Sequence, residues 1–216
     1  DGLCALLQLR LADPIKSQLV TGLKRDIQLL DDVKVQHGDQ VTVLDISFDK
    51  NRDSVSRILD QGASVFYIDH HQSGEIPEHK NLKTIINTDA NVCTSLLVND
   101  YLEGKYRAWA VTAAFGDNMF ESAEKAAFPL TLSENQLQQL KLLGICINYN
   151  SYGTSLADLH YAPDLLYREM EQYESPFDFI ADNDEVYEKI LTGYSDDMIS
   201  AEHTKADYQT DKVAVY

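Results

Sequence analysis

The sequence predicts an α/β fold, with a parallel sheet flanked by helices on both faces and followed by a helical extension or linker. Short, β-branched apolar segments alternate along the chain with longer helical segments, which is typical of βαβ units. The 216 residues, 44% of them hydrophobic, suffice for one large domain or one and a half, with a sizeable core. Because open parallel sheets bind ligands at the carboxyl ends of their strands, we expect functional side chains there.

The first half of the chain contains the predicted strands. β-Branched and apolar residues dominate each of them, and Gly62 is suited to the end of the helix that precedes the third. In chain order, we expect a helix directly after Asp1-Gly2, a strand over 17–22, a helix over 24–33, a strand over 40–47, a helix over 51–62, and strands over 64–71 and 82–88.

The second half of the chain is predicted to be helical. Ser133 is a natural N-cap, with Glu134 in the first turn behind it. We expect helices over 91–104, over 106–127 with an interruption at "FGDN", and over 133–149, and a mostly helical segment rich in Tyr, Asp and Glu from Gly153 onward.

This pattern predicts two parts, residues 1–152 and residues 153–216. The opening "DGLCALLQLRLA" is already helical, so a first strand is expected upstream of Asp1. The closing "DKVAVY" is expected to open a strand, so 153–216 is interpreted as a linker and the start of a truncated C-terminal domain.

Composition limits the class of partner. With 18 basic and 35 acidic residues the formal net charge is −17, which excludes a broad basic face for long duplex nucleic acid. A small phosphate ester or a short oligonucleotide in a metal-lined cleft remains compatible. The sequence has three distant cysteines without a CxxC pair, no recognisable signal peptide and no apolar run of transmembrane length. These features favour a cytoplasmic protein without membrane contact. The oligomeric state stays open.

The segment "VFYIDHHQSG" places an acid and two histidines where a buried strand is expected to end. On an extended backbone Asp69 and His71 would share one side and His70 would take the other. A lone histidine at a strand end is usually a structural residue. Two histidines beside a carboxylate form a richer cluster, since imidazole and carboxylate are common metal ligands.

Further acids are expected at the same rim of the sheet. Asp45 follows the strand "TVL", Asp1 precedes the first helix, and Asp117 lies at the helix break beside Gly116. Asp45 alone is more simply explained as a helix N-cap. Together, three acids and a histidine suit Mn²⁺ or Mg²⁺ better than structural Zn²⁺, which prefers thiolates.

These residues resemble the signature of the DHH phosphoesterase superfamily. "YIDHHQSG" is similar to the motif that names it, "DGLCALLQL" to the latter half of its first motif, "VLDIS" to its second and "AAFGDN" to its fourth. The four occur in the family's order and spacing over residues 1–152, which the resemblance identifies as a DHH catalytic domain. The family includes RecJ-type exonucleases, nano-RNA and cyclic-dinucleotide phosphodiesterases, and manganese-dependent pyrophosphatases and exopolyphosphatases.

The resemblance implies a role for each matched residue. Asp45 would bridge two Mn²⁺ ions, with Mg²⁺ or Co²⁺ as alternatives, and Asp1, His70 and Asp117 would complete one ion's ligands. The other ion would take two ligands upstream of Asp1. Asp69 would support the cluster, and His71 would face the substrate phosphate.

The resemblance also implies an activity. A phosphodiester of a short oligonucleotide or cyclic dinucleotide would be hydrolysed by a hydroxide that bridges two metals about 3.5–4 Å apart. A phosphoanhydride hydrolase of the pyrophosphatase or exopolyphosphatase type is one alternative, and a non-catalytic metal- or nucleotide-binding regulator is another. A C-terminal domain with glycine-rich motifs, which usually selects the substrate in this family, is not recognisable here.

Several polar residues near the motifs have weaker assignments. Lys24 and Arg25 could reach a phosphate at the same rim, although a solvated helix start explains them more simply. Asn118 could orient a ligand or only form a turn. Asp158 and His160 could close over the site from the second segment.

Overall fold

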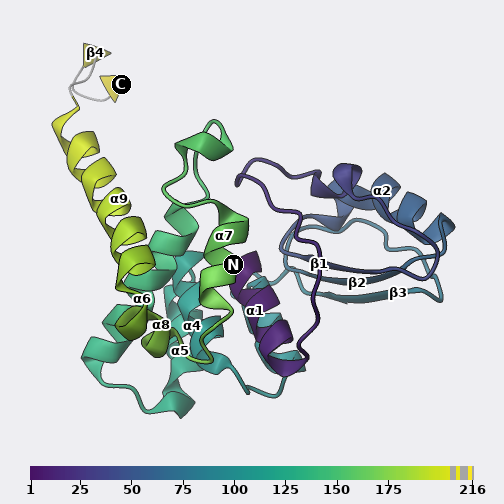
Figure 1. Ribbon diagram of the computed structural model, residues 1–216, viewed down its shortest axis with the longest axis horizontal. Coiled ribbons are helices and arrows are strands. Elements are labelled where there is room, and N and C mark those ends of the chain that lie inside the picture. The colour runs from purple at the N-terminus through teal and green to yellow at the C-terminus, as the bar shows by residue number, and fades with distance from the viewer. Residues whose placement is uncertain (205–207, 210–213, 216) are drawn as a thin grey trace.

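A three-stranded parallel sheet is the centre of one half of the molecule (Figure 1). This computed structural model describes residues 1–204, 208–209 and 214–215. The strands are β1 (Gln40–Leu44), β2 (Ser64–Asp69) and β3 (Leu82–Ile86), in the order β1-β2-β3. Both pairings are parallel, so the α/β class predicted from the sequence is observed in a small sheet.

Alternating side chains of β2 face two different layers of helix. Val65 and Tyr67 pack with α2 (Phe48–Asp60), where the Tyr67 ring meets the Phe48 ring edge-on at a centroid distance of 5.0 Å. Ile68, on the opposite face, packs with residues of α1 (Gly2–Ala12) and α3 (Thr94–Tyr101). The two-residue period of the strand therefore separates the two cores.

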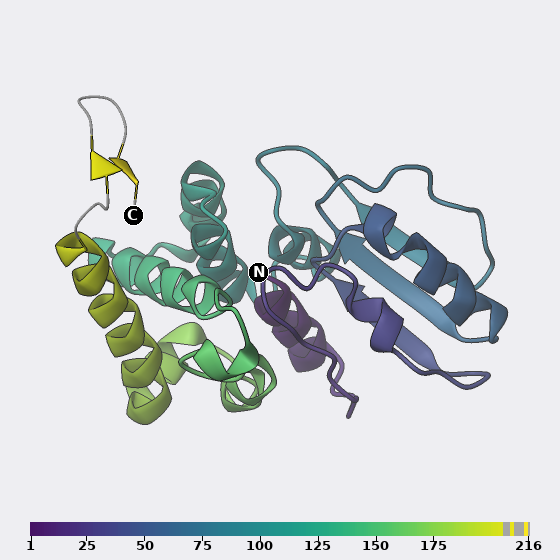
Figure 2. The same ribbon diagram turned by 90° about the horizontal axis from the view of Figure 1, so that it is seen from above.

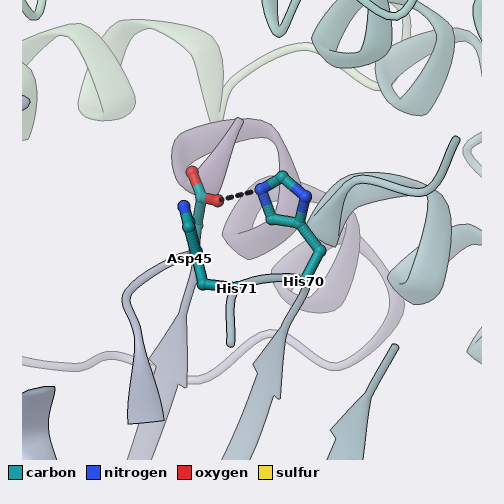
Figure 3. A group of neighbouring side chains, drawn as sticks. All are labelled: Asp45, His70 and His71. Carbon is teal, nitrogen blue, oxygen red and sulfur yellow. Dashed lines mark ion pairs between the residues drawn. The ribbon is translucent and has the colours of Figure 1, made fainter. Parts of the chain in front are cut away.

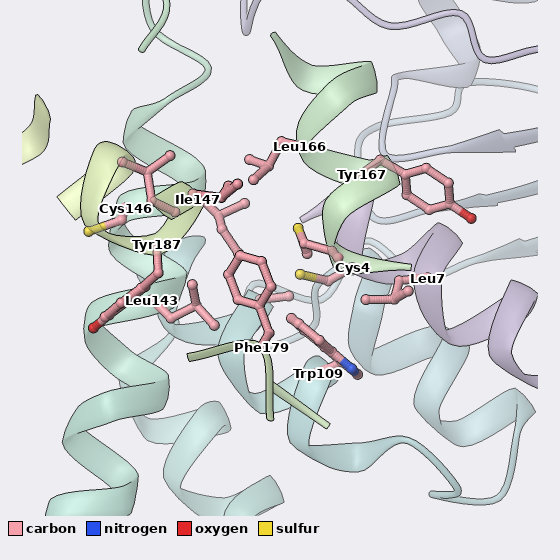
Figure 4. Packing of buried hydrophobic residues seen from close by; sticks show 14 of the residues in the cluster. Cys4, Leu7, Trp109, Leu143, Cys146, Ile147, Leu166, Tyr167, Phe179 and Tyr187 are labelled. Carbon is pink, nitrogen blue, oxygen red and sulfur yellow. The ribbon is translucent and has the colours of Figure 1, made fainter. Parts of the chain in front are cut away.

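The other half of the molecule is helical, and α1 lies between it and the sheet (Figure 2). Its core surrounds the fully buried Trp109, whose indole N–H donates to the Glu174 carbonyl at 3.1 Å (Figure 4). The helices are α4 (Arg107–Gly116), α5 (Phe120–Ala127), α6 (Glu134–Tyr149), α7 (Pro163–Met170), α8 (Pro176–Asp182) and α9 (Asp184–His203).

Several predicted element boundaries agree with the structure. The Ser133 hydroxyl accepts from the Gln136 backbone N–H and the Gln136 side chain reaches back to Ser133, so α6 starts in a capping box. Gly62 follows the end of α2 with a φ of +83°, the left-handed backbone that glycine adopts without strain. The interruption predicted at "FGDN" separates α4 from α5.

The strand predicted over 17–22 was wrong. The segment is irregular and pairs with no strand among the described residues, and Gly22 leads into a turn in which Asp26 accepts from the Leu23 N–H at 2.7 Å. An apolar β-branched segment becomes a strand only where a neighbouring backbone completes its hydrogen bonds.

The helix predicted over 24–33 was also wrong, because only the 3₁₀ turn Leu29–Asp32 forms. Side chains from α2 take the backbone groups that a helix would have paired internally. Asn51 bonds the Leu30 N–H and the Ile27 carbonyl, and Arg57 donates to the Leu30 and Val33 carbonyls. Tertiary hydrogen bonds therefore replace the local ones.

The segment after Gly153 is mostly helical over the described residues, as predicted. The 3₁₀ turn Leu156–Asp158 and α7–α9 follow one another, and α7, α8 and α9 bury Leu166, Phe179 and Ile190 in the same core as α1, α4 and α6. A division of the chain at residue 152 stays a prediction. A strand was predicted over 211–216. Within it the structure describes β5 (Ala214–Val215), which pairs antiparallel with β4 (Tyr208–Gln209), and the other residues of that range lie outside the described residues.

No helix in the described part of the chain combines the length and the apolar character needed to cross a membrane.

Candidate metal centre

The site begins where β1 and β2 end side by side. The register pairs Leu44 with Ile68, so Asp45 and Asp69 leave the sheet at the same edge. The Asp45 N–H still donates to the Ile68 carbonyl at 3.2 Å, and this bond holds the Asp45 backbone against β2. The Asp45 carboxylate then faces the ring of His70, with 3.5 Å between Oδ1 and Nε2 (Figure 3).

Asp45 is held in an uncommon conformation. Its φ of +63° lies in the left-handed region, which aspartate tolerates better than most residues. The Gly2 N–H donates to Oδ2 at 2.8 Å, and the Thr94 hydroxyl donates to Oδ1 at 3.3 Å. Burial raises the pKa of Asp45, but the interaction with His70 and nearby positive charge outweigh it and lower the pKa to about 2. The group is therefore an anion with two oriented oxygens.

Asp1 is fixed by the start of α3. Its two carboxylate oxygens accept from the backbone N–H groups of Thr94 and Ser95, at 2.8 and 2.9 Å. These N–H groups have no partner inside the helix and carry its positive dipole end, so they favour a carboxylate. Each oxygen retains a second lone pair for a further ligand.

Asp117 belongs to the helical half of the molecule and directly follows the end of α4. Its N–H donates to the Ala113 carbonyl at 2.8 Å, and the left-handed Asn118, with a φ of +65°, then turns the chain away. The Asp117 Oδ2 atom lies 3.6 Å from His70 Nε2. The His70 nitrogen thus faces two carboxylates at distances too long for strong hydrogen bonds.

The arrangement of the histidine doublet differs from the prediction of opposite faces. β2 ends at Asp69, so strand alternation no longer governs the next two residues, and the rings of His70 and His71 lie 4.4 Å apart. The expected proximity of Asp69 and His71 is present, because Asp69 Oδ1 lies 2.7 Å from His71 Nδ1. Asp69 is fully buried, whereas His71 is 45% exposed.

Both histidines have raised pKa values. Burial lowers the pKa of His70, but Asp45 and the charge of Asp117 raise it above its usual value. The hydrogen bond with Asp69 is the main reason that the pKa of His71 is raised. That bond also makes Nδ1 the protonated nitrogen of a neutral His71, which leaves Nε2 free.

The predicted ligands therefore fall into two overlapping groups that share His70. Asp1, His70 and Asp117 each offer an atom within 4.8 Å of the others, and so do Asp45, His70 and His71. Carboxylate oxygens with imidazole nitrogen suit Mn²⁺, Mg²⁺ or Co²⁺. The two long contacts of His70 with Asp45 and Asp117 leave space that a divalent ion would fit.

Thr94 and Ser95 were missed in the sequence. Both are buried, and they orient Asp45 and Asp1. The one available signal was the pair of hydroxyl residues at the start of the helix in "NVCTSLL", which predicts a helix N-terminus but not the acids that bind it.

Of the residues with weaker assignments, Lys24 lies beside the cluster, whereas Arg25, Asp158 and His160 bond to other parts of the chain. The Lys24 ammonium lies 3.7 Å from Asp117 Oδ1, and the Arg25 guanidinium donates to the Gly153 carbonyl at 2.7 Å. Asp158 and His160, which could have closed over the site, make contacts elsewhere. Asp158 accepts from the Ser155 N–H, and His160 Nε2 lies 2.9 Å from Asp197 Oδ2, because both residues fasten the segment after α6 to itself and to α9.

The cysteines take no part in the site. Cys4, Cys93 and Cys146 are free and buried. Burial raises the pKa of Cys4 to about 11 and those of Cys93 and Cys146 to about 12, so their thiols stay neutral near pH 7.

A scan against protein-family models, a search of curated proteins and a search of solved structures each found no match to this chain.

Proposed function

We propose that this protein is a metal-dependent phosphoesterase of the DHH type, which hydrolyses a phosphodiester of a short oligonucleotide or cyclic dinucleotide with Mn²⁺ as the preferred ion. One observation carries the proposal. Asp1, Asp45 and Asp117 come from three separate elements, and each places a carboxylate oxygen close to a ring nitrogen of His70. Carboxylates this close together repel one another, and a bound divalent cation would offset that repulsion more fully than His70 and Lys24 do.

The chain's own residues would divide the work. Asp1, His70 and Asp117 would hold one ion, and Asp45 would add a carboxylate beside His70. A bound divalent metal supplies an activated water and neutralises phosphoryl charge. The backbone N–H groups of Thr94 and Ser95 would keep the Asp1 carboxylate in place when a metal ion binds or leaves beside it.

His71 is proposed to act on the substrate. Asp69 holds its Nδ1–H, so Nε2 can donate a hydrogen bond to a phosphoryl oxygen once the ring is protonated, the form that the raised pKa of His71 favours. Aspartate and histidine in this order resemble other catalytic pairs, in which a buried carboxylate orients an imidazole.

The cavity beside the cluster supports a substrate larger than a phosphate ion. It has a volume of about 1220 Å³ and is lined by Asp1, Asp45 and His71, among others. Typical small-molecule sites occupy roughly 300–1,000 Å³. A short oligonucleotide or a cyclic dinucleotide would fit such a space.

The division of the chain into domains and the location of the protein are part of the same proposal. Residues 1–152 would form the DHH catalytic domain, with its sheet flanked by helices on both faces, and the segment from 153 would lead to a C-terminal domain that selects the substrate. A cytoplasmic location would agree with the free thiols.

Metal binding and hydrolysis test the function together. We expect the purified protein to bind Mn²⁺ in calorimetry and to hydrolyse a short oligonucleotide or a cyclic dinucleotide. EDTA should abolish turnover and Mn²⁺ should restore it. Asp117→Asn should weaken Mn²⁺ binding at least roughly 10–100-fold, whereas Asp158→Asn, the same change away from the cluster, should not.

The outcomes separate the alternatives. Hydrolysis of polyphosphate or pyrophosphate alone would favour a phosphoanhydride hydrolase. Mn²⁺ binding without turnover on any of these compounds would favour a regulator. Turnover that survives exhaustive chelation would rule out the metal-dependent mechanism.

A further inference from the structure

Lys24 lies at the rim of the metal centre although it is distant in sequence from every motif. Its ammonium is 3.7 Å from Asp117 Oδ1 and 3.2 Å from the Asn148 side-chain oxygen. It lines the same cavity as Asp1, Asp45 and His71. The solvated helix start that would have explained it is absent, because residues 22–28 form turns and irregular backbone.

The turn that carries Lys24 does not need its ammonium group. Asp26 accepts from the Leu23 N–H, the Lys24 N–H donates to the Ser151 carbonyl at 2.9 Å, and Arg25 donates to the Gly153 carbonyl. The Lys24 side chain is 43% exposed, and exposed ion pairs contribute little to stability. The backbone is thus fixed by other groups while the charged end can move.

The cavity wall is less acidic than the chain as a whole. The described residues that line it include five basic and five acidic ones, in a chain with 18 basic and 35 acidic residues. Two of the five acids, Asp1 and Asp45, are the proposed metal ligands. Once a metal takes their charge, basic residues predominate on the wall.

We propose that Lys24 is a phosphate-binding residue, which moves from Asp117 to a phosphoryl oxygen of the substrate when Asp117 binds metal. This inference rests on the proposed function. Lysine suits the role, because its compact charge on a flexible stem can serve two partners in turn. The ligand class is a phosphate ester whose phosphoryl group lies between the metal centre and the turn at residues 22–26.

Binding of inorganic phosphate to the Mn²⁺-loaded protein tests the role without relying on turnover. Charge-assisted hydrogen bonds are strong, so Lys24→Met should weaken phosphate binding roughly tenfold or more in calorimetry. Mn²⁺ affinity should stay the same or rise slightly, because a cation beside Asp117 is removed. Lys24→Arg should restore part of the phosphate affinity.

The matched control is Lys34→Met, which removes the same charge from an exposed residue of the same cavity wall. It should change phosphate affinity less than twofold. Circular dichroism and the melting temperature should show that both variants fold, as the turn is held by other groups.

The possible failures are distinguishable. If Lys24→Met binds phosphate as tightly as the wild type, or if Lys34→Met loses as much, the assignment of Lys24 is wrong and the metal centre is unaffected. A different result is that the wild type binds phosphate but no Mn²⁺, and that Lys24→Met no longer binds phosphate. In that case the proposed function fails and the phosphate site stands.

Discussion

Asp45 shows how a single residue can combine a backbone role with a chemical one. Its left-handed φ of +63° turns the chain at the end of β1, and its two oxygens receive bonds from Gly2 and Thr94. Strained backbone of this kind is concentrated at functional sites, where the surroundings over-determine it. The two neighbouring histidines differ in their contacts. Asp69 fixes the ring of His71, whereas His70 faces Asp45 and Asp117.

The two histidines should respond differently to removal. His70→Ala deletes a proposed ligand, so Mn²⁺ affinity should fall by at least roughly 10–100-fold. His71→Ala should leave Mn²⁺ binding nearly intact and lower turnover by roughly 10²–10³, the usual loss when one transition-state donor is removed. Calorimetric titration of Mn²⁺ and a steady-state assay measure the two effects.

The control for this pair is His79→Ala, at an exposed histidine whose hydrogen bond is local. It should change neither quantity. Equal loss of metal in His70→Ala and His71→Ala would mean that His71 is itself a ligand, as its place with Asp45 and His70 allows.

At the level of elements, the crossing of α4 and α6 determines where Asp117 lies. A Cβ atom on Gly144 would lie 2.0 Å from the Thr112 carbonyl oxygen and 2.9 Å from the Gly116 backbone nitrogen. The two helices therefore touch backbone to backbone, one residue before Asp117. Glycine at 144 is required by this close approach.

Gly144→Ala should destabilise the protein and damage the site together. Overpacking against rigid backbone typically costs about 1–3 kcal/mol, and forcing α4 away would displace Asp117 from His70. Urea unfolding should give the loss of stability, and Mn²⁺ titration should show weaker binding. Gln138→Ala, at an exposed position of the same helix, should stay within about 0.5 kcal/mol of wild type. An unchanged stability in Gly144→Ala would contradict the close crossing.

At the scale of the whole molecule, the candidate metal centre lies between two halves with separate cores. Asp45 and His70 follow strands of the sheet, whereas Asp117 follows α4 in the helical half. The chain as a whole is strongly acidic, whereas the cavity wall carries equal numbers of basic and acidic residues.

Binding of long duplex DNA should therefore be weak. With a net charge of −17 the protein can displace few counterions from a duplex, and repulsion should dominate at physiological salt. Fluorescence anisotropy with a labelled duplex should show no binding in the low micromolar range, whereas a short single-stranded oligonucleotide should bind when Mn²⁺ is present. Tight duplex binding by this chain would show that its charge is not the controlling factor.

The sequence by itself determined the α/β class, most of the helices, the three acids near His70, and strands predicted over 40–47, 64–71 and 82–88, which the structure shortens to 40–44, 64–69 and 82–86. Each of these follows from local signals, namely side-chain periodicity, helix caps such as Ser133, and acids placed directly after strands.

Only the tertiary structure decided what depends on contacts between distant residues. The segment 17–33 carries strand and helix patterns, yet it forms neither over most of its length, because its backbone lacks a paired neighbour and is bonded by Asn51 and Arg57. Thr94 and Ser95 orient acids 49 and 94 residues away. Lys24 reaches Asp117 through a turn held by the segment after α6. Such contacts leave no periodic trace in a single sequence, since they depend on how separate elements pack.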